Sequence, residues 1–187
     1  IDKAGRWVTA PIFDFCLPFQ GAVAAIIHNQ KWGLIDRKGA ILCAPQFEIL
    51  DLSNTGLFFE GRCRIAQKEQ FGFIDEKGTV VVEPRYDSVG DYSEGLALVE
   101  IDGKLGYLNA DGAMAIAAQF EDAGVFSAGL APAKAKGKWG FIDPEGTFVI
   151  SPQYQVVHPF KNGLARVVQK SKWAYINKSG DVVWKEI

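Results

Sequence analysis

The chain repeats one short stretch, Lys138-Trp139-Gly140-Phe141-Ile142-Asp143-Pro144-Glu145-Gly146, at regular intervals. Close copies of this signature occupy residues 31–39 and 70–78, and weaker copies occupy residues 104–112 and 172–180. Repetition at a fixed period of this length is typical of proteins in which each repeat forms one supersecondary unit. The signature therefore indicates a tandem-repeat protein.

The period is about 34 residues and defines the expected units. The Ile/Leu-Asp/Asn pair of the signature starts at positions 1, 35, 74, 108, 142 and 176, with spacings of 34, 39, 34, 34 and 34. The single longer spacing comes from an insertion around residues 50–58. We expect one repeat array over residues 1–187, with a partial unit at 1–20 and units at about 21–54, 55–94, 95–128, 129–162 and 163–187.

Each unit contains three runs of strand-forming residues. The first follows a glycine, as in residues 95–101, and ends at a turn such as Asp102-Gly103, a strong hairpin signal. The second is the signature, closed by an Asp-x-x-Gly turn. The third, as in residues 147–150, is expected to stop at the proline that follows it. The prediction is an all-β fold of three-strand antiparallel units stacked as an open, solenoid-like superhelical array. A propeller-like closed ring is the alternative.

The Trp-Gly pair calls for a packing explanation, because glycine inside a strand lowers stability unless another group approaches closely. We expect an aromatic ring or the backbone of the neighbouring unit to lie over this glycine. The tryptophan column is then expected to form a continuous buried spine. Its members are Trp32, Phe71, Leu105, Trp139 and Trp173.

Composition narrows the classes of partner. The net charge is −2 and the basic residues are scattered, so nucleic-acid binding is not expected. No apolar run is long enough for a membrane span. The three cysteines lack a Cys-x-x-Cys spacing, and Cys43 and Cys63 fall at interior strand positions, which favours the cytoplasm. Because the sequence opens within a repeat motif, a periplasmic or secreted location stays open.

The residues favour structural roles over catalytic ones. The Asp/Asn column of the signature turns is expected to shape turns rather than to bind cations. Only two histidines occur, His28 and His158, at different positions of their repeats. No phosphate-binding loop or zinc-protease motif is present. We expect no catalytic residues, no metal and no cofactor, with a hydrolase as the least favoured alternative.

Two groups of residues are candidates for contact with a partner. The insertion is unusually apolar for a loop, and it either covers its own unit or docks a protein. The second group is an acidic column after the proline position, which either caps connector amides or forms an acidic edge for a basic partner. The candidate residues are Leu50, Leu52, Leu57, Phe58, Phe59, Asp14, Glu48, Asp87 and Glu121.

The signature resembles the WG (KWG) repeats, a family of bacterial tandem β-repeat proteins. The resemblance rests on the Lys-Trp-Gly-aromatic-Ile-Asp motif, an upstream Gly-Leu-Ala and a downstream Pro-x-aromatic-Asp, and it covers nearly the whole chain. Phe71, Leu105 and Ala174 depart from the motif. The family implies a β-repeat array without a common activity. We therefore expect a non-enzymatic scaffold that binds another protein, with a polysaccharide or cell-envelope binding module as the alternative.

Overall fold

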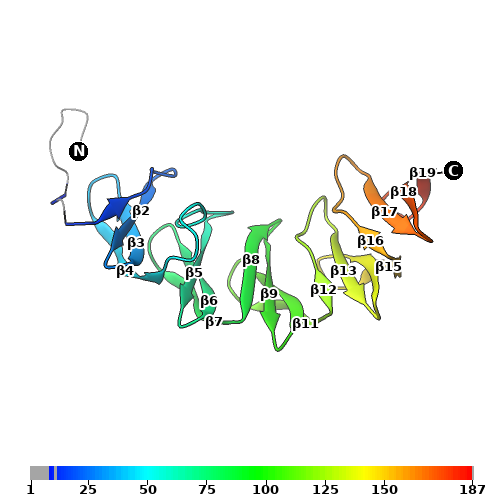
Figure 1. The fold of residues 1–187 in the computed structure, drawn as a ribbon, viewed down its shortest axis with the longest axis horizontal. Coiled ribbons are helices and arrows are strands. Elements are labelled where there is room, and N and C mark those ends of the chain that lie inside the picture. The colour runs from blue at the N-terminus through cyan, green and yellow to red at the C-terminus, as the bar shows by residue number, and fades with distance from the viewer. Residues whose placement is uncertain (1–8, 11, 187) are drawn as a thin grey trace. The chain divides into compact units, whose positions relative to one another are not determined.

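The computed structural model describes residues 9–10 and 12–186, and they form antiparallel sheets joined by turns, with no helix among them (Figure 1). By its internal contacts the chain divides into two compact parts, Ile1–Tyr86 and Asp87–Ile187, which are called the first and the second unit from here on. Each of them is larger than a single repeat and contains more than one sheet. Of the partial unit expected at residues 1–20, residues 1–8 and 11 lie outside the described residues.

The first unit contains two sheets. The first sheet has the order β1-β2-β3-β4, and the second has the order β5-β6-β7. Their strands are β1 (Phe15–Cys16), β2 (Val23–His28), β3 (Lys31–Asp36), β4 (Ile41–Glu48), β5 (Arg62–Gln67), β6 (Gln70–Asp75) and β7 (Val80–Tyr86).

The second unit contains three four-stranded sheets, the third, fourth and fifth along the chain. Each keeps the chain order of its strands. The third sheet comprises β8 (Ser88–Ser93), β9 (Leu96–Ile101), β10 (Lys104–Asn109) and β11 (Met114–Phe120). The fourth comprises β12 (Asp122–Ala123), β13 (Ala131–Ala135), β14 (Lys138–Ile142) and β15 (Phe148–Tyr154). The fifth comprises β16 (Val156–Val157), β17 (Ala165–Gln169), β18 (Lys172–Ile176) and β19 (Val182–Lys185).

The prediction of an all-β chain of small antiparallel sheets is confirmed. Four of the five sheets add a strand to the three expected, because the connector after the proline pairs with the first long strand, as in Asp122↔Lys134. None of the described sheets closes into a barrel. The open arrangement of the whole array, with a closed ring as its alternative, stays a prediction.

The third run does not stop at the proline, which corrects the prediction. Strand β15 runs through Pro152 to Tyr154 and contains a register shift there, since Trp139 pairs with Tyr154 but Phe141 pairs with Ile150. A bulge of this kind leaves residues outside the hydrogen-bond ladder, so a proline is tolerated in it. The same shift occurs at Pro45 in β4 and at Pro84 in β7.

This bulge explains the strand glycine of the signature. A Cβ on Gly140 would lie 2.3 Å from the carbonyl oxygen of Ile150, in the adjoining strand of the same sheet. Gly33, Gly72 and Gly106 face their own third strands in the same way. The expectation that a neighbouring unit covers the glycine is therefore wrong.

The fifth sheet has neither the glycine nor the bulge at this position. There Ala174 replaces the glycine, Ala174 and Tyr175 pair with the consecutive residues Lys185 and Trp184, and no bulge occurs between them. A methyl group is tolerated at this position because the third strand does not cross over it.

The predicted tryptophan spine is correct only at its first member. Trp32 is buried and packs against Phe47, with ring centroids 5.4 Å apart. The other four members are only partly buried. The residue two positions after the tryptophan is buried more regularly, since Leu34, Phe73, Tyr107 and Phe141 are almost wholly buried and only Tyr175 in the fifth sheet is exposed.

Candidate functional site

The insertion of the first unit lies between β4 and β5 and is held together by Asp51. The Asp51 carboxylate accepts hydrogen bonds from the Ser53 hydroxyl at 2.6 Å and from the Asn54 side chain at 2.8 Å. The Thr55 hydroxyl donates to the Asp51 carbonyl. The hydrogen bond from the Ser53 hydroxyl is the main reason that the pKa of Asp51 is lowered from its usual value. The insertion is therefore a loop with its own polar framework.

The five apolar candidates of the insertion fall into two groups. Leu50 and Leu52 are exposed to 62% and 54%, and Phe59 is also exposed. Leu57 and Phe58 are partly buried. Phe58 packs against the core of the first unit, and its amide donates to the Gln20 side chain at 3.1 Å. Leu50 and Leu52 are thus the members most available to a partner.

Leu52 lines a hollow of about 480 Å³ together with residues of the first sheet. Its apolar lining includes Phe15, Ile27 and Ile49, and Asp14 adds a carboxylate at its rim. Phe15 is itself strongly exposed. The structure therefore brings two of the predicted candidates, Asp14 and Leu52, to one place.

Sequence reasoning missed Phe15 and Ile49 as members of this hollow. A signal existed for Phe15, because the corresponding connector positions hold Ser88, Asp122 and Val156, so that the first repeat alone carries an aromatic there. Ile49 stands at the same connector position as Phe15, because it follows Glu48 as Phe15 follows Asp14, so the repeat pattern also linked these two residues.

The acidic column has a defined structural role, but the groups that it caps differ from those expected. Each side chain accepts a hydrogen bond from a backbone amide in the next two-residue hairpin turn, not from the connector. The pairs are Asp14 with Asn29 at 2.7 Å, Glu48 with Lys68 at 2.9 Å, Asp87 with Asp102 at 3.0 Å and Glu121 with Gly137 at 2.9 Å. Gln155 does the same for Ser171 at 2.9 Å.

These turns need such support because both of their residues have positive φ. In the first sheet Asn29 and Gln30 have φ of 51° and 59°, and in the second sheet Lys68 and Glu69 have φ of 54° and 61°. This geometry matches the twist of a two-residue hairpin but is strained for residues other than glycine and asparagine. The carboxylate offsets part of that strain by satisfying an exposed turn amide.

Glu48 shows the electrostatic consequence of this contact. The hydrogen bond from the Lys68 amide is the main cause that lowers the pKa of Glu48 below its usual value of 4.5. The positive charge of Lys31 lowers this pKa further. The Lys31 Nζ lies 3.6 Å from a Glu48 carboxylate oxygen. Each acidic side chain of the column thus uses at least one of its acceptor sites inside the fold.

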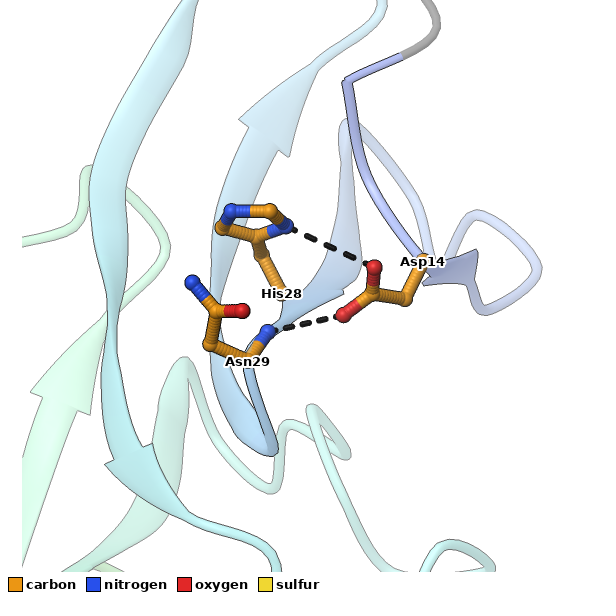
Figure 2. A network of polar contacts seen from close by, with 3 residues as sticks. All are labelled: Asp14, His28 and Asn29. Atoms are coloured by element: carbon orange, nitrogen blue, oxygen red, sulfur yellow. Dashed lines mark hydrogen bonds and ion pairs between the residues drawn. The ribbon is translucent and has the colours of Figure 1, made fainter.

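Figure 2 shows this arrangement around Asp14, whose carboxylate lies between the Asn29 amide and the His28 ring. The Nδ1 of His28 is 3.6 Å from a carboxylate oxygen of Asp14, and both side chains are about half exposed. The other histidine, His158, accepts a hydrogen bond on Nε2 from the Arg166 guanidinium at 2.9 Å. The polar contacts of the two histidines are therefore with an acid, Asp14, and with an arginine, Arg166, rather than with a hydroxyl or thiol nucleophile.

The Asp/Asn column shapes turns, as predicted. Asp36 accepts hydrogen bonds from the amides of Lys38 and Ala40, both at 2.8 Å. Asp75, Asn109 and Asn177 make the same pair of contacts in their own turns. Among residues 9–10 and 12–186, no group of three or more His, Cys, Asp or Glu side chains could hold a metal ion.

Two further predictions concern the cysteines and the absence of a long apolar segment. Cys43 and Cys63 are buried, as their strand positions indicated, whereas Cys16 is exposed. The described part of the chain contains no helix that is long and apolar enough to cross a membrane.

Comparison with known families gives one match. The model of the WG containing repeat matches residues 1–32, 71–104, 106–139 and 139–173, which together exceed half of the chain. No curated protein sequence matched.

Solved structures give a likeness of fold. A structure of Hsv2p from Kluyveromyces lactis has a TM-score of 0.50 and 11% identity, over 90% of this chain and 62% of that one. PorZ of Porphyromonas gingivalis, described as a surface component of the type-IX secretion system, has a TM-score of 0.44 and 12% identity, over 93% of this chain and 26% of that one. The chain thus spans less than two thirds of these relatives.

Proposed function

The chain belongs to the WG containing repeat family, and from that membership we propose that it is a non-enzymatic scaffold that binds another protein. We place the binding surface at the insertion of the first unit. The observation that carries this proposal is the apolar hollow lined by Phe15, Ile27, Ile49 and Leu52.

The exposure of these side chains supports a docking role. Of the residues that line the hollow, Phe15 and Leu52 are each more than half exposed, and Leu50 in the same insertion is also more than half exposed but does not line it. Exposed apolar groups that gather at one hollow mark interaction sites more often than scattered ones do. Insertions of repeat proteins also tend to lie on the binding face.

The charge beside the hollow suggests the chemistry of the partner. One oxygen of Asp14 accepts the hydrogen bond of the Asn29 amide, and the other lies 3.6 Å from His28 Nδ1, in a side chain that is 57% exposed. A basic side chain of the partner would fit beside its apolar anchor. Charges at the rim of an interface mainly improve specificity and association rate.

Carbohydrate binding is the second candidate, and the signature tryptophans are the residues that would serve it. Trp139 and Trp173 are partly exposed. Each ring already has a cation over it, since the Lys134 Nζ lies 6.0 Å from the Trp139 centroid and the Arg166 Cζ lies 4.3 Å from the Trp173 centroid. His158 also stacks on Trp173. These contacts compete with a sugar for the flat faces of the rings, so we favour the protein partner.

Capture from lysate of the source organism tests the proposal. Three baits are compared: the wild type, a Leu50→Ser/Leu52→Ser variant, and a Met114→Ser/Val149→Ser control. The control alters two exposed apolar residues of the second unit. We expect one protein to be retained by the wild type and the control and lost by the insertion variant. A photo-crosslinking residue at position 52 should then join that protein to the bait.

Two outcomes would contradict this assignment. Equal retention by all three baits would place the binding surface elsewhere. If no protein is retained and the wild type co-sediments with insoluble polysaccharide, the carbohydrate alternative replaces the protein partner. Mass spectrometry and sedimentation on the same preparations separate these results.

A further inference from the structure

Within the second unit, successive sheets pack through the same three positions. Leu96, Tyr107 and Ile116 of the third sheet share a core cluster with residues of the fourth sheet. Leu130, Phe141 and Ile150 of the fourth sheet share one with the fifth. All six side chains are at most 9% exposed. To each cluster the next sheet along the chain contributes a phenylalanine from its connector, a small residue and an aliphatic residue. These are Phe126, Ala131 and Ile142 in the fourth sheet, and Phe160, Ala165 and Ile176 in the fifth.

Specific contacts fix how the sheets meet. The rings of Tyr107 and Phe126 lie 5.0 Å apart, and those of Phe141 and Phe160 lie 4.8 Å apart. The Tyr107 hydroxyl donates to the carbonyl of Gly124 in the next connector at 2.7 Å.

Two further contacts recur at this interface. Ser93 and Ser127 donate to the carbonyls of Phe126 and Phe160, each at 2.8 Å. The isoleucine of one sheet also contacts the turn glycine of the next, because a Cβ on Gly146 would lie 2.7 Å from Ile116.

The fifth sheet presents the same three positions to solvent. Leu164, Tyr175 and Trp184 occupy the places of Leu130, Phe141 and Ile150, and their exposed fractions are 36%, 39% and 53%. Tyr175 and Trp184 contact each other, with centroids 5.9 Å apart. Leu164 and Tyr175 line a hollow of about 460 Å³. We call these three residues the end face.

We infer that the end face is an interaction surface whose occupant is one further WG repeat. The face continues the series of sheet-to-sheet contacts that the second unit already contains, so the chemistry of its occupant follows from those contacts. The occupant must offer a connector phenylalanine to Tyr175, a small residue and an isoleucine to the apolar surface, and a turn glycine to Trp184.

Polar groups at the end face support this match. Tyr175 stands in the place of Tyr107, so its hydroxyl can donate to a connector carbonyl of the occupant, as Tyr107 does to Gly124. Lys161 stands in the place of Ser127, and its ammonium is a donor where the hydroxyl of Ser127 donates to Phe160. An apolar ligand without these carbonyls would meet only part of the face.

This inference goes beyond the proposed function and uses other residues. The insertion lies in the first unit, whereas the end face belongs to the fifth sheet. If the Leu50→Ser/Leu52→Ser variant fails to capture a partner, the inference about the end face is not affected.

The test adds a repeat to the full chain. A copy of residues 120–154 is joined directly after Ile187, which keeps the 34-residue period of the preceding repeats. We expect the added strands to become protected, with amide exchange at least about tenfold slower than in a scrambled extension of the same composition. We also expect a higher melting temperature, because each stacked repeat adds a nearest-neighbour interface.

A matched pair of variants shows whether the end face is responsible. Tyr175→Asp with Trp184→Asp should abolish the protection of the added repeat, whereas Val149→Asp, at an exposed position of β15, should preserve it. Circular dichroism of the unextended variants checks that the parent fold is intact.

Three results would overturn the inference. The added repeat could exchange like the scrambled one, or it could be protected equally in the Tyr175→Asp/Trp184→Asp chain. The unextended wild type could also dimerise in sedimentation through Tyr175 and Trp184, which would assign the face to a second copy.

Discussion

The backbone carbonyl of Ile150 lies directly over Gly140, so closely that a Cβ at position 140 would be 2.3 Å from its oxygen. This relationship joins the two most regular features of the repeat, the Trp-Gly pair and the proline that follows the third run. The proline marks a bulge, and the bulge carries the backbone over the glycine. The third sheet keeps the bulge and the crowded Gly106 with Ala118 in place of the proline, so the glycine depends on the bulge rather than on the proline itself.

Gly140→Ala should destabilise the second unit by about 1–3 kcal/mol, as overpacking does when backbone must shift. Gly90→Ala is the matched control, since its Cβ would lie 3.3 Å from the Leu98 Cβ and no closer than 4.0 Å to the backbone of Leu98. Urea unfolding followed by tryptophan fluorescence measures both. Equal losses in the two variants would mean that the crossing over Gly140 is not what excludes a side chain.

Removal of a hairpin cap should lower stability modestly. Glu121→Ala leaves the Gly137 amide without its carboxylate acceptor and should reduce the free energy of unfolding by about 1 kcal/mol. Glu121→Gln should cost less, because Gln155 performs the same role in the fifth sheet. Thermal melts compare these variants with Glu145→Ala, an exposed turn position. If Glu121→Ala melts like Glu145→Ala, the cap does not stabilise the fold.

The tryptophans of the signature should differ in their effect on stability. Trp32→Ala removes a buried ring and should cost about 3–5 kcal/mol. Trp139→Ala should cost clearly less, since that ring is partly exposed and a lysine rather than a full shell of apolar groups lies over it. Denaturant midpoints of the two variants provide the comparison. A larger loss for Trp139→Ala would show that the half-exposed ring is the more important one.

Acidic pH should remove the contribution of the ionised Glu48 carboxylate to the stability of the folded state. Its folded pKa is lower than the usual 4.5, so the ionised form is stabilised in the native state. The unfolded chain therefore binds the proton more readily, and the stabilisation is present above pH 4.5 and lost as the pH falls through the folded value. The difference in melting temperature between wild type and Glu48→Gln should shrink over that range. A difference that stays constant from neutral pH to below pH 4 would rule out this linkage.

The candidate site was only partly predictable from the sequence. The insertion stood out because it breaks a regular period, and its apolar residues could be named. Their division into exposed Leu50 and Leu52 and partly buried Phe58 was not predicted, although Phe58 precedes Gly61 by the same three positions that separate the connector Phe126 from Gly129. The acidic column was recognised as a capping series, but the amides that it caps belong to hairpin turns brought close only by strand pairing.

The sequence by itself determined the repeat period, the all-β class, the hairpin turns and the Asp-x-x-Gly turns, because these depend on local backbone preferences that recur in every repeat. The tertiary structure decided which groups become neighbours. Gly140 lies under Ile150 because a bulge shifts the register of β15, and Phe15 joins Leu52 at one hollow because the insertion folds beside the first sheet. Tyr175 is exposed where Phe141 is buried because a following sheet covers one and not the other. The contacts of Leu52 and Phe141 arise from packing between segments of different repeats, whereas the crossing over Gly140 lies within one repeat and depends on the register of its third strand.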